Sequence, residues 1–480
     1  MYTTLKLPFL FLLTALSMAA CSFNPRAQWV CTTENAPWQT MSELISASAD
    51  TFPETDVEIR LDAEHQSIEG FGACFNELGW LALSKLEPNL REEIMEELFF
   101  PGLGANFTLC RMPIGANDFS RDWYSYNETD GDFTMQHFTI ANDQQTLIPF
   151  IRSARKYQPE LRLWASPWCP PTWMKYNRHY ASTPTNPACE EKYRNGLPPD
   201  WAGQEGADLF IQDSLYLQAY ARYFSRFIEA YREQGIPVFA VMPQNEFNSA
   251  QVFPSCCWTA ASLARFVGRY LGPAMENLGV QVFFGTMERP NEALVDTLLT
   301  DPACQEYIRG VGFQWAGKDA LPGIRRRYPA LRYYQTEQEC GDGHNDWAGA
   351  MYAWRLMLHY LQNGVSGYLY WNIALEEGGI SRWGWAQNSL IVVDPATGTF
   401  RYTPEYYALK HASHYVQPGA RLLSTEGAYT NLLAFRNPDK TLVVIAANET
   451  SDDRQVRIRI ADRVYRPQLP AHSLNTLFLH

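Results

Sequence analysis

The sequence lacks the spaced residues that mark several common chemistries. None of its nine histidines stands in an HExxH zinc pattern, its ten cysteines include no CxxC pair, and no Asp-rich calcium loop occurs. A GxSxG elbow of a serine hydrolase is missing, and no glycine-rich phosphate turn follows any expected strand. We therefore expect neither a metal nor an organic cofactor.

Positive charge and long apolar runs are also scarce. The 39 Lys and Arg residues face 52 Asp and Glu residues, which gives a net charge of −13. Nucleic acids and anionic lipids require a basic surface, so neither is an expected partner. Beyond the first 20 residues, no apolar stretch is long enough to cross a membrane.

Residues 1–20 have the pattern of an export signal. Lys6 supplies the positive charge, an apolar segment covers residues 7–16, and Ala19-Ala20 precede Cys21. The end of this segment resembles a bacterial lipoprotein signal, which predicts a protein anchored in the periplasm or at the cell surface through a lipid on Cys21. Met18 replaces the usual Leu, so soluble secretion stays open. Export permits disulfides, and we expect several buried free cysteines with at most one disulfide.

What the chain does contain is an abundance of aromatic side chains. Aromatic residues make up 14% of the chain, with 15 Trp and 26 Tyr. Sugar-binding clefts stack flat aromatic faces on pyranose rings, although a large aromatic core explains the same composition.

The middle of the chain alternates apolar strands with helical segments. Helical spacing is clear over 215–234 and 347–361, and eight strands are predicted at 70–73, 107–111, 162–165, 238–243, 281–285, 310–314, 332–336 and 367–371. This rhythm predicts an α/β fold, a (β/α)8 TIM barrel over residues 65–415. A doubly wound sheet is disfavoured because it lacks the phosphate turn.

The two ends of the chain lack the alternation of strands and helices that predicts the barrel. Short strands separated by polar turns predict a small β-sandwich domain over residues 416–480. An alternating segment at 51–64 predicts a strand that joins this domain. Residues 21–50 are expected to form a tether with an ordered part near Trp38.

Two carboxylates are expected at the mouth of the barrel. Asn245-Glu246 follows the buried strand at 238–243, and Glu337 follows the strand at 332–336. Either one alone fits a surface loop equally well. Together, on separate strand ends, they match a retaining glycosidase, in which one carboxyl group is the nucleophile and the other is the acid and base. The acid must have a raised pKa to stay protonated.

Further polar and aromatic residues follow other strands. Arg111 is placed to favour the ionised form of a carboxylate, Asp118 lies just beyond it, and Trp168 follows the third strand. Trp371-Asn372 ends the eighth strand. Each of these residues alone fits a core Trp or a surface polar group.

Six segments of the chain resemble glycoside hydrolase family 30, which includes glucosylceramidases and β-1,6-glucanases. They are Glu69–Ala73, Arg111–Ser120, Ala165–Lys175, Gln244–Glu246, Thr336-Glu337 and Trp371–Leu375. The resemblance implies a retaining mechanism without metal, in which Glu337 is the nucleophile and Glu246 the acid/base. It further implies that Asn245 binds the sugar 2-hydroxyl, Asp118 binds outer hydroxyls, and Trp168 and Trp371 pack on the ring.

The chain departs from this family pattern in three places. Gln314 stands where the family often has His, and Trp385 where the glucosylceramidase-like branch has Asn. Glu339 adds a carboxylate close to Glu337. We expect Arg382 and Trp383 to line an altered sugar site.

The predicted function is a retaining β-glycosidase of the glucosylceramidase, β-glucosidase or β-1,6-glucanase type, acting on a carbohydrate or glycolipid. Alternatives are a β-fucosidase or β-xylosidase of the same family, or a non-catalytic carbohydrate-binding lipoprotein. The predicted substrate-binding residues are Asn245, Asp118, Trp168, Trp371, Arg111, Asn372 and Trp385.

Overall fold

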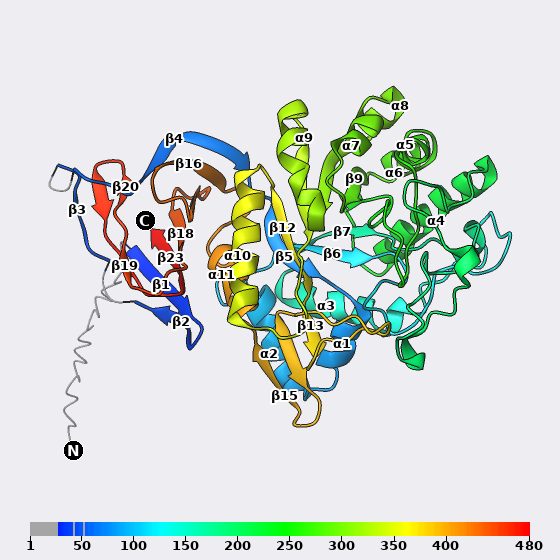
Figure 1. The fold of residues 1–480 in the computed structure, drawn as a ribbon, viewed down its shortest axis with the longest axis horizontal. Helices are drawn as coiled ribbons and strands as arrows, with labels where there is room; N and C mark the ends of the chain where they lie inside the picture. Colours follow the sequence, from blue (N-terminus) through cyan, green and yellow to red (C-terminus); the bar gives the residue numbers. More distant parts are fainter. Residues whose placement is uncertain (1–26, 42–43, 51–52) are drawn as a thin grey trace, which may run out of the picture.

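The computed structural model describes residues 27–41, 44–50 and 53–480. The export signal at 1–20 and the lipidation site Cys21 lie outside the described residues. Figure 1 shows a large barrel beside a smaller all-β part that contains both ends of the described chain. Within the described ranges, no helix is both long and apolar enough to cross a membrane.

Eight parallel strands close into a barrel in which each strand pairs with its neighbours in the chain. They are β5 (Gly70–Cys74), β6 (Leu109–Pro113), β7 (Arg162–Ser166), β8 (Ala240–Val241), β9 (Gln281–Met287), β10 (Ile308–Gln314), β11 (Arg332–Glu337) and β12 (Gly367–Asn372). The predicted TIM barrel is confirmed. Only β8 is much shorter than expected, although Phe239 N and Met242 N still donate to carbonyls of β7.

The barrel strands are buried on both faces, which is why they read as continuous apolar runs. Neighbouring strands approach closely where glycine occurs. A Cβ atom on Gly72 would lie 1.9 Å from the carbonyl oxygen of Leu109 on the adjacent strand, so only glycine fits there.

Helices surround the barrel and fill the connections between its strands (Figure 1). The two helices predicted in the sequence are α4 (Ser214–Glu233) and α10 (Trp347–Gln362), each begun by an Asp whose side chain caps a backbone N–H. The others are α1 (Glu77–Leu83), α2 (Pro88–Phe99), α3 (Leu147–Tyr157), α5 (Ala260–Phe266), α6 (Gly272–Asn277), α7 (Glu292–Leu299), α8 (Pro302–Gln305), α9 (Leu321–Arg327) and α11 (Pro404–Ser413). Three short strands beside the barrel, β13 (Ala374–Glu376), β14 (Ile391–Asp394) and β15 (Thr399–Tyr402), form a separate sheet.

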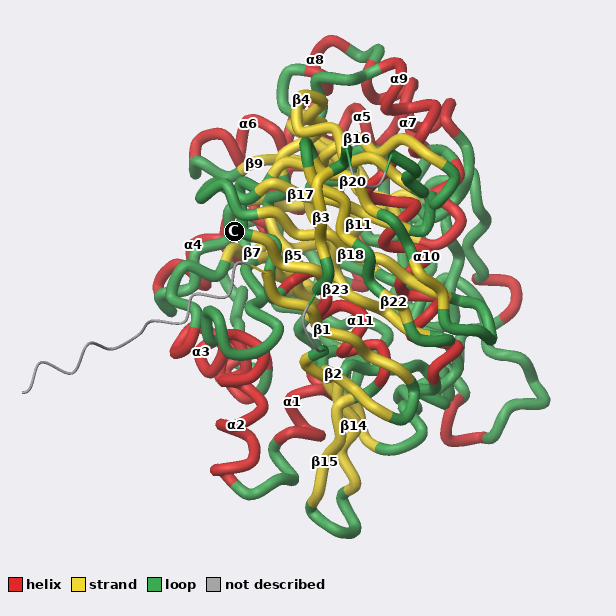
Figure 2. Tube along the Cα trace, turned by 90° about the vertical axis from the view of Figure 1, so that its left-hand side faces the viewer, coloured by secondary structure: helices red, strands yellow, loops and turns green. Residues whose placement is uncertain are grey.

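The smaller part is a curled ten-stranded sheet, seen in front of the barrel in Figure 2. Its order is β2 (Ala36–Thr40), β1 (Ala27–Thr33), β23 (Ser473–Leu479), β18 (Leu442–Asn448), β17 (Leu432–Arg436), β16 (Arg421–Gly427), β4 (Val57–Ser67), β20 (Ile458–Ile460), β21 (Arg463–Tyr465) and β3 (Ser46–Ser48). A two-stranded ribbon of β19 (Arg454–Gln455) and β22 (Gln468–Leu469) accompanies it.

The expected tether over 21–50 is wrong for its described strands. β1 pairs along its full length with β23, its residues Trp29, Val30 and Cys31 are buried, and the Trp29 indole donates to Asn475 over 3.0 Å. The polar turn between β1 and β2 hid this hairpin, because it interrupts the apolar pattern after only a few residues.

The two parts of the molecule share one hydrophobic core. Leu433, Phe435 and Val443 from the sheet belong to the same buried cluster as the barrel. His411 on α11 also contacts Thr32 and Thr476 of the sheet at 2.9 and 2.8 Å. All nine cysteines in the described part of the chain are free thiols, so the disulfide that we allowed for is absent there.

Candidate active site

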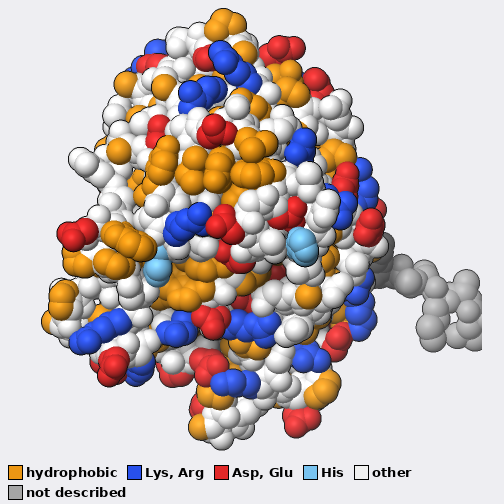
Figure 3. Space-filling model, turned by 90° about the vertical axis from the view of Figure 1, so that its right-hand side faces the viewer, with side chains coloured by type: hydrophobic (Ala, Val, Ile, Leu, Met, Phe, Trp, Pro, Cys, Tyr) orange, Lys and Arg blue, Asp and Glu red, His pale blue; other side chains and the backbone are white. Residues whose placement is uncertain are grey.

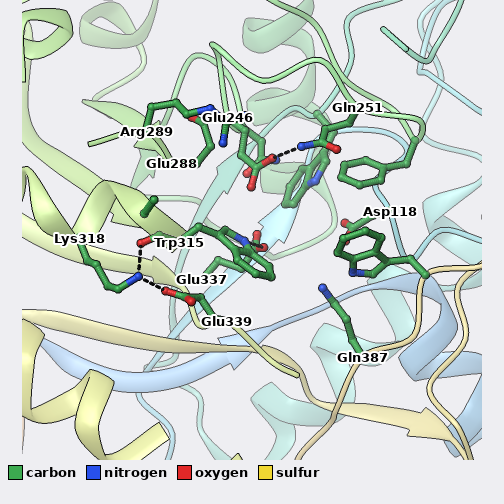
Figure 4. A pocket seen from close by; sticks show the side chains of 15 residues that line it. Asp118, Glu246, Gln251, Glu288, Arg289, Trp315, Lys318, Glu337, Glu339 and Gln387 are labelled. Carbon is green, nitrogen blue, oxygen red and sulfur yellow. Dashed lines mark hydrogen bonds and ion pairs between the residues drawn. The ribbon is translucent and has the colours of Figure 1, made fainter. Parts of the chain in front are cut away.

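A cavity of about 320 Å³ lies at the carboxyl ends of the barrel strands. Figure 3 views the side of the molecule away from the ten-stranded sheet, where hydrophobic side chains gather in bands among acidic and basic ones. Six of the predicted site residues line the cavity: Asp118, Trp168, Asn245, Glu246, Glu337 and, at its rim, Trp385. Figure 4 shows their acidic groups turned toward a common space.

Glu337 ends β11 and is held by two donors. Its Oε2 atom accepts a hydrogen bond from Arg111 Nη1 over 2.8 Å, and its Oε1 atom accepts one from Trp315 Nε1 over 3.3 Å. Burial raises the pKa of Glu337 above its ordinary value, and the charge of the Arg111 guanidinium opposes this rise. The paired guanidinium therefore favours an ionised carboxylate at this position.

Arg111 lies beneath the cavity and does not line it. It is fully buried, donates to Asn245 Oδ1 over 2.7 Å and to Ser166 Oγ over 2.8 Å, and packs 4.2 Å from the ring centre of Trp168. Direct binding of substrate by Arg111 stays a prediction. Its planar guanidinium group holds the side chains of Glu337 and Asn245 in fixed positions relative to each other.

Glu246 has neutral hydrogen-bond partners. Its Oε1 atom accepts from Gln314 Nε2 over 3.1 Å, and its Oε2 atom accepts a longer bond from Gln251 over 3.5 Å. Burial, followed by the charge of Glu337, raises the pKa of Glu246 well above the ordinary value. Burial and this charge therefore favour the protonated form of Glu246, whereas Glu337 has a guanidinium that opposes protonation.

The backbone at Glu246 adopts a left-handed conformation with φ of 45°, which is uncommon for a residue with a side chain. Thr286 maintains it, since its hydroxyl accepts from Glu246 N over 2.9 Å and donates to Asn245 Oδ1 over 3.1 Å. Backbone strain of this kind is typical of functional sites that the surrounding structure holds in place.

Asn245 is oriented by three donors. Its Oδ1 atom accepts from Arg111, Thr286 and Gln314, at 2.7, 3.1 and 3.2 Å. Because the oxygen is fully used, the amide NH2 group of Asn245 is the part left for a ligand in the cavity.

Asp118 and two stacked indoles form the wall opposite Glu246. The rings of Trp168 and Trp371 stack with centres 5.3 Å apart, and Trp371 Nε1 donates to Asp118 Oδ2 over 3.3 Å. Burial and the charge of Glu337 raise the pKa of Asp118 well above its usual range. Only Trp168 and Asp118 line the cavity, so Trp371 supports this wall from behind. A contact between Trp371 and the sugar stays a prediction.

Asn372 also lies behind the wall. It is fully buried, accepts from Asn76 over 2.9 Å, and donates to Gln387 Oε1 over 3.1 Å. It positions Gln387, which does line the cavity, and its own role as a substrate ligand stays a prediction.

The loop from 380 to 387 contributes one indole to the rim. Trp385 is 43% exposed and lies 6.5 Å from the ring of Phe253, which also lines the cavity. The expectation that Arg382 and Trp383 line the site is wrong. Arg382 donates to the carbonyl of Lys192, and Trp383 is buried against Trp123 with ring centres 4.6 Å apart.

Several lining residues were not predicted from the sequence. Gln251, Phe253, Glu288, Arg289, Trp315 and Lys318 belong to the loops after β8, β9 and β10. Glu288 and Trp315 directly follow strand ends, a position that marks them as candidates. In Figure 4, Lys318 pairs with Glu339 over 2.7 Å on the wall away from Asp118. Glu339 thus has a lysine partner, whereas Glu337 has the buried arginine.

The site combines two buried carboxyl groups in different environments, an adjacent asparagine and walls of indole rings, at one end of a closed parallel barrel. This combination is typical of barrel enzymes that cleave glycosidic bonds. The profile of the Glycosyl hydrolase family 30 TIM-barrel domain matches residues 68–192 and 202–416, and that of the family 30 beta sandwich domain matches residues 422–477. The chain belongs to glycoside hydrolase family 30, and it is a glycoside hydrolase.

Individual relatives agree with this assignment. The chain is 28% identical to "Putative glucosylceramidase 1" of Caenorhabditis elegans, over 90% of this chain and 85% of that protein. It is 26% identical to "Endo-1,6-beta-D-glucanase neg1" of Aspergillus fumigatus, over 86% of this chain and 85% of that protein. The solved structure of "The endo-beta1,6-glucanase BT3312" has the same fold, with a TM-score of 0.80, 22% identity, and coverage of 95% of this chain and 99% of the other.

Proposed function

We propose that the protein is a retaining β-glycosidase in which Glu337 is the nucleophile and Glu246 the acid/base. The observation that carries this proposal is the unequal surroundings of the two groups. Glu337 accepts from the buried Arg111 guanidinium at 2.8 Å, whereas Glu246 accepts from the neutral amides of Gln314 and Gln251. A nucleophile must be ionised and a general acid protonated, and these environments separate the two states.

In the first step, a carboxylate oxygen of Glu337 forms a bond to the anomeric carbon while the bond to the leaving oxygen breaks. Glu246 gives its proton to that oxygen. In the second step, Glu246 takes a proton from water, the water oxygen attacks the anomeric carbon, and Glu337 leaves as a carboxylate. Two inversions at one carbon retain the β-configuration.

The remaining wall residues have matching roles in this proposal. The free amide NH2 of Asn245 donates to the sugar 2-hydroxyl, a bond that strengthens as the transition state develops. Asp118 has a buried Oδ1 atom without a hydrogen-bond partner among the described residues, and an outer sugar hydroxyl satisfies it. The indole face of Trp168 packs on the apolar face of the ring.

The curated relatives include proteins named glucosylceramidase and endo-1,6-β-D-glucanase, which supports β-linked glucose as the unit that is cleaved. Turnover of an aryl β-glucoside should therefore exceed turnover of the matching β-fucoside, β-xyloside and β-galactoside. A preference for the fucoside or the xyloside would instead support the alternative glycones and would indicate that the rim around Trp385 determines which sugar is bound.

Variants of the two carboxyl groups test the assignment. Glu337→Gln should lose about 10⁴-fold or more of kcat on an activated aryl β-glucoside, since no covalent bond can form. Glu246→Ala should be restored in part by azide, which enters the space left by the side chain and yields a β-glucosyl azide. Glu339→Gln is the matched control. If Glu339→Gln is the inactive variant and Glu337→Gln turns over normally, the assignment is wrong. A chain that binds β-glucan but never cleaves it would be the non-catalytic alternative.

We also propose that the protein is exported and anchored through a lipid on Cys21, because of the residues at 1–21. Cys21→Ser should release the protein from the membrane fraction and abolish incorporation of labelled fatty acid. Equal membrane retention of wild type and variant would contradict the anchor.

A further inference from the structure

A third buried carboxyl group lines the cavity, and the mechanism above does not use it. Glu288 follows directly after β9 and is 2% exposed. Its Oε1 atom has no hydrogen-bond partner among the residues that the structure describes, and the nearest cation is Arg289, whose Nε atom lies 3.4 Å away in an ion pair. Arg289 itself is turned toward Glu205, to which it donates over 2.6 Å. Glu288 therefore has hydrogen-bonding capacity that a ligand in the cavity can use.

Glu288 lies on the same side of the cavity as Glu246. Thr286, two residues before Glu288, holds the backbone of Glu246. Figure 4 shows Glu288 beside Glu246 and Arg289, with Asp118 across the cavity. The charges agree with this placement, since the charge of Glu288, after burial and the charge of Glu337, contributes to the raised pKa of Glu246. The general acid must stand beside the leaving oxygen, so Glu288 faces the leaving group and Asp118 the glycone.

We propose that Glu288, supported by Arg289, binds hydroxyl groups of the sugar unit that leaves, and that the substrate is an oligosaccharide or polysaccharide rather than a glycolipid. This inference rests on the proposed retaining mechanism. It assigns a residue that determines leaving-group specificity.

The chemistry of the group favours a sugar over a lipid at this position. A carboxylate accepts two hydrogen bonds from neighbouring hydroxyls, and such charge-assisted bonds are stronger than neutral ones. An alkyl chain against Glu288 would remove its remaining access to water and return no hydrogen bond, which is unfavourable. The rings of Phe253 and Trp385 at the rim offer flat faces on which a sugar stacks.

Partitioning of the glycosyl-enzyme tests this inference directly. An acceptor sugar occupies the leaving-group site and competes with water for the intermediate formed from an aryl β-glucoside. The ratio of transfer product to hydrolysis product, at a fixed glucose concentration, reports binding in that site and is independent of how fast the intermediate forms. We expect Glu288→Gln and Glu288→Ala to lower this ratio by about tenfold to a hundredfold, because one hydrogen bond to a charged group contributes about that factor to binding.

A second measurement compares leaving groups. For the wild type, kcat/KM on a β-linked glucose disaccharide should exceed kcat/KM on a long-chain alkyl β-glucoside, and Glu288→Ala should lower that ratio at least about tenfold. Glu229→Gln, which removes an exposed carboxylate on α4, is the charge control. Thermal unfolding of each variant shows that it folds.

The outcomes separate the two proposals. If both Glu288 variants fold and keep the transfer ratio and the substrate ratio within twofold of the wild type, the assignment of Glu288 is overturned. A wild type that prefers the alkyl glucoside over the disaccharide overturns the choice of a sugar leaving group. If the wild type hydrolyses the aryl glucoside with inversion, the retaining mechanism itself fails, and this is visible without any variant.

Discussion

The contact between Arg111 and Glu337 permits a quantitative prediction about the nucleophile. Arg111→Met removes a fully buried guanidinium that donates over 2.8 Å to Glu337 and over 2.7 Å to Asn245. Breaking one side of a buried ion pair typically costs about 3–5 kcal/mol, because the remaining charge is left without a partner. Glu337 escapes this penalty by binding a proton.

The consequence for activity follows from the sign of the shift. The guanidinium lowers the pKa of Glu337 against the effect of burial, so its loss raises that pKa. An interaction of about 3 kcal/mol corresponds to roughly two pKa units. The nucleophile must be ionised, so the acidic limb of the profile of kcat/KM against pH should move to higher pH by about that amount. At moderately acid pH, the variant should lose about a hundredfold in kcat/KM.

The assay is the pH dependence of kcat/KM on an aryl β-glucoside. Arg162→Met is the matched control, since Arg162 pairs with Glu69 over 3.0 Å away from the cavity. That variant should lose stability and keep the wild-type acidic limb. If Arg111→Met keeps the wild-type limb while remaining folded, Arg111 does not set the ionisation of Glu337, and the argument from unequal surroundings fails.

Three further predictions concern other ionisable groups. Glu246→Gln should keep much of its kcat/KM, which reports the first step, on substrates with good leaving groups. It should lose kcat/KM steeply as the leaving group becomes more basic, which a series of aryl glucosides measures, and a slope equal to that of the wild type contradicts the role of Glu246 as acid. Burial raises the pKa of Glu288 to about 7, so its charged form destabilises the folded state at alkaline pH. Glu288→Gln should therefore increase the free energy of unfolding by about 3 kcal/mol at roughly pH 8 and by little at roughly pH 5. An equal effect at both pH values would contradict this cause. Burial, followed by the charge of Lys410, lowers the pKa of His411 to about 3, so the free energy of unfolding should fall as the pH drops below about 6.5. His411→Gln should make the free energy of unfolding, measured by urea titration, depend less on pH.

The residues that follow directly after strands were the ones that the sequence located well. The barrel strands are buried on both faces, so they appear as short apolar runs, and the polar groups that end them meet at one end of the barrel. This placed Asn245, Glu246 and Glu337 correctly at the cavity. The same reasoning extends to Glu288 and Trp315, which also follow strand ends.

The sequence did not show which side chains of a loop face the cavity. Trp385 lines it, while Arg382 donates to the carbonyl of Lys192 and Trp383 packs against Trp123. Similarly, Asn372 follows the pattern of a strand-end residue but is satisfied by buried neighbours. Such orientation depends on contacts between distant loops, which leave no local periodicity. The strand β1 was missed because the polar turn after it shortens its apolar pattern, and its partner β23 at the other end of the chain leaves no local signal.

The most direct test of the central claim is to trap the covalent intermediate. An activated β-glucoside in which fluorine replaces the sugar 2-hydroxyl slows both steps, and the good leaving group allows the first step to proceed, so the glucosyl-enzyme accumulates. Fragmentation of the labelled peptide by mass spectrometry then distinguishes Glu337 from Glu339. We predict one fluoroglucosyl group per chain, attached to Glu337. A label on Glu339, or inactivation without any covalent label, would contradict the assignment.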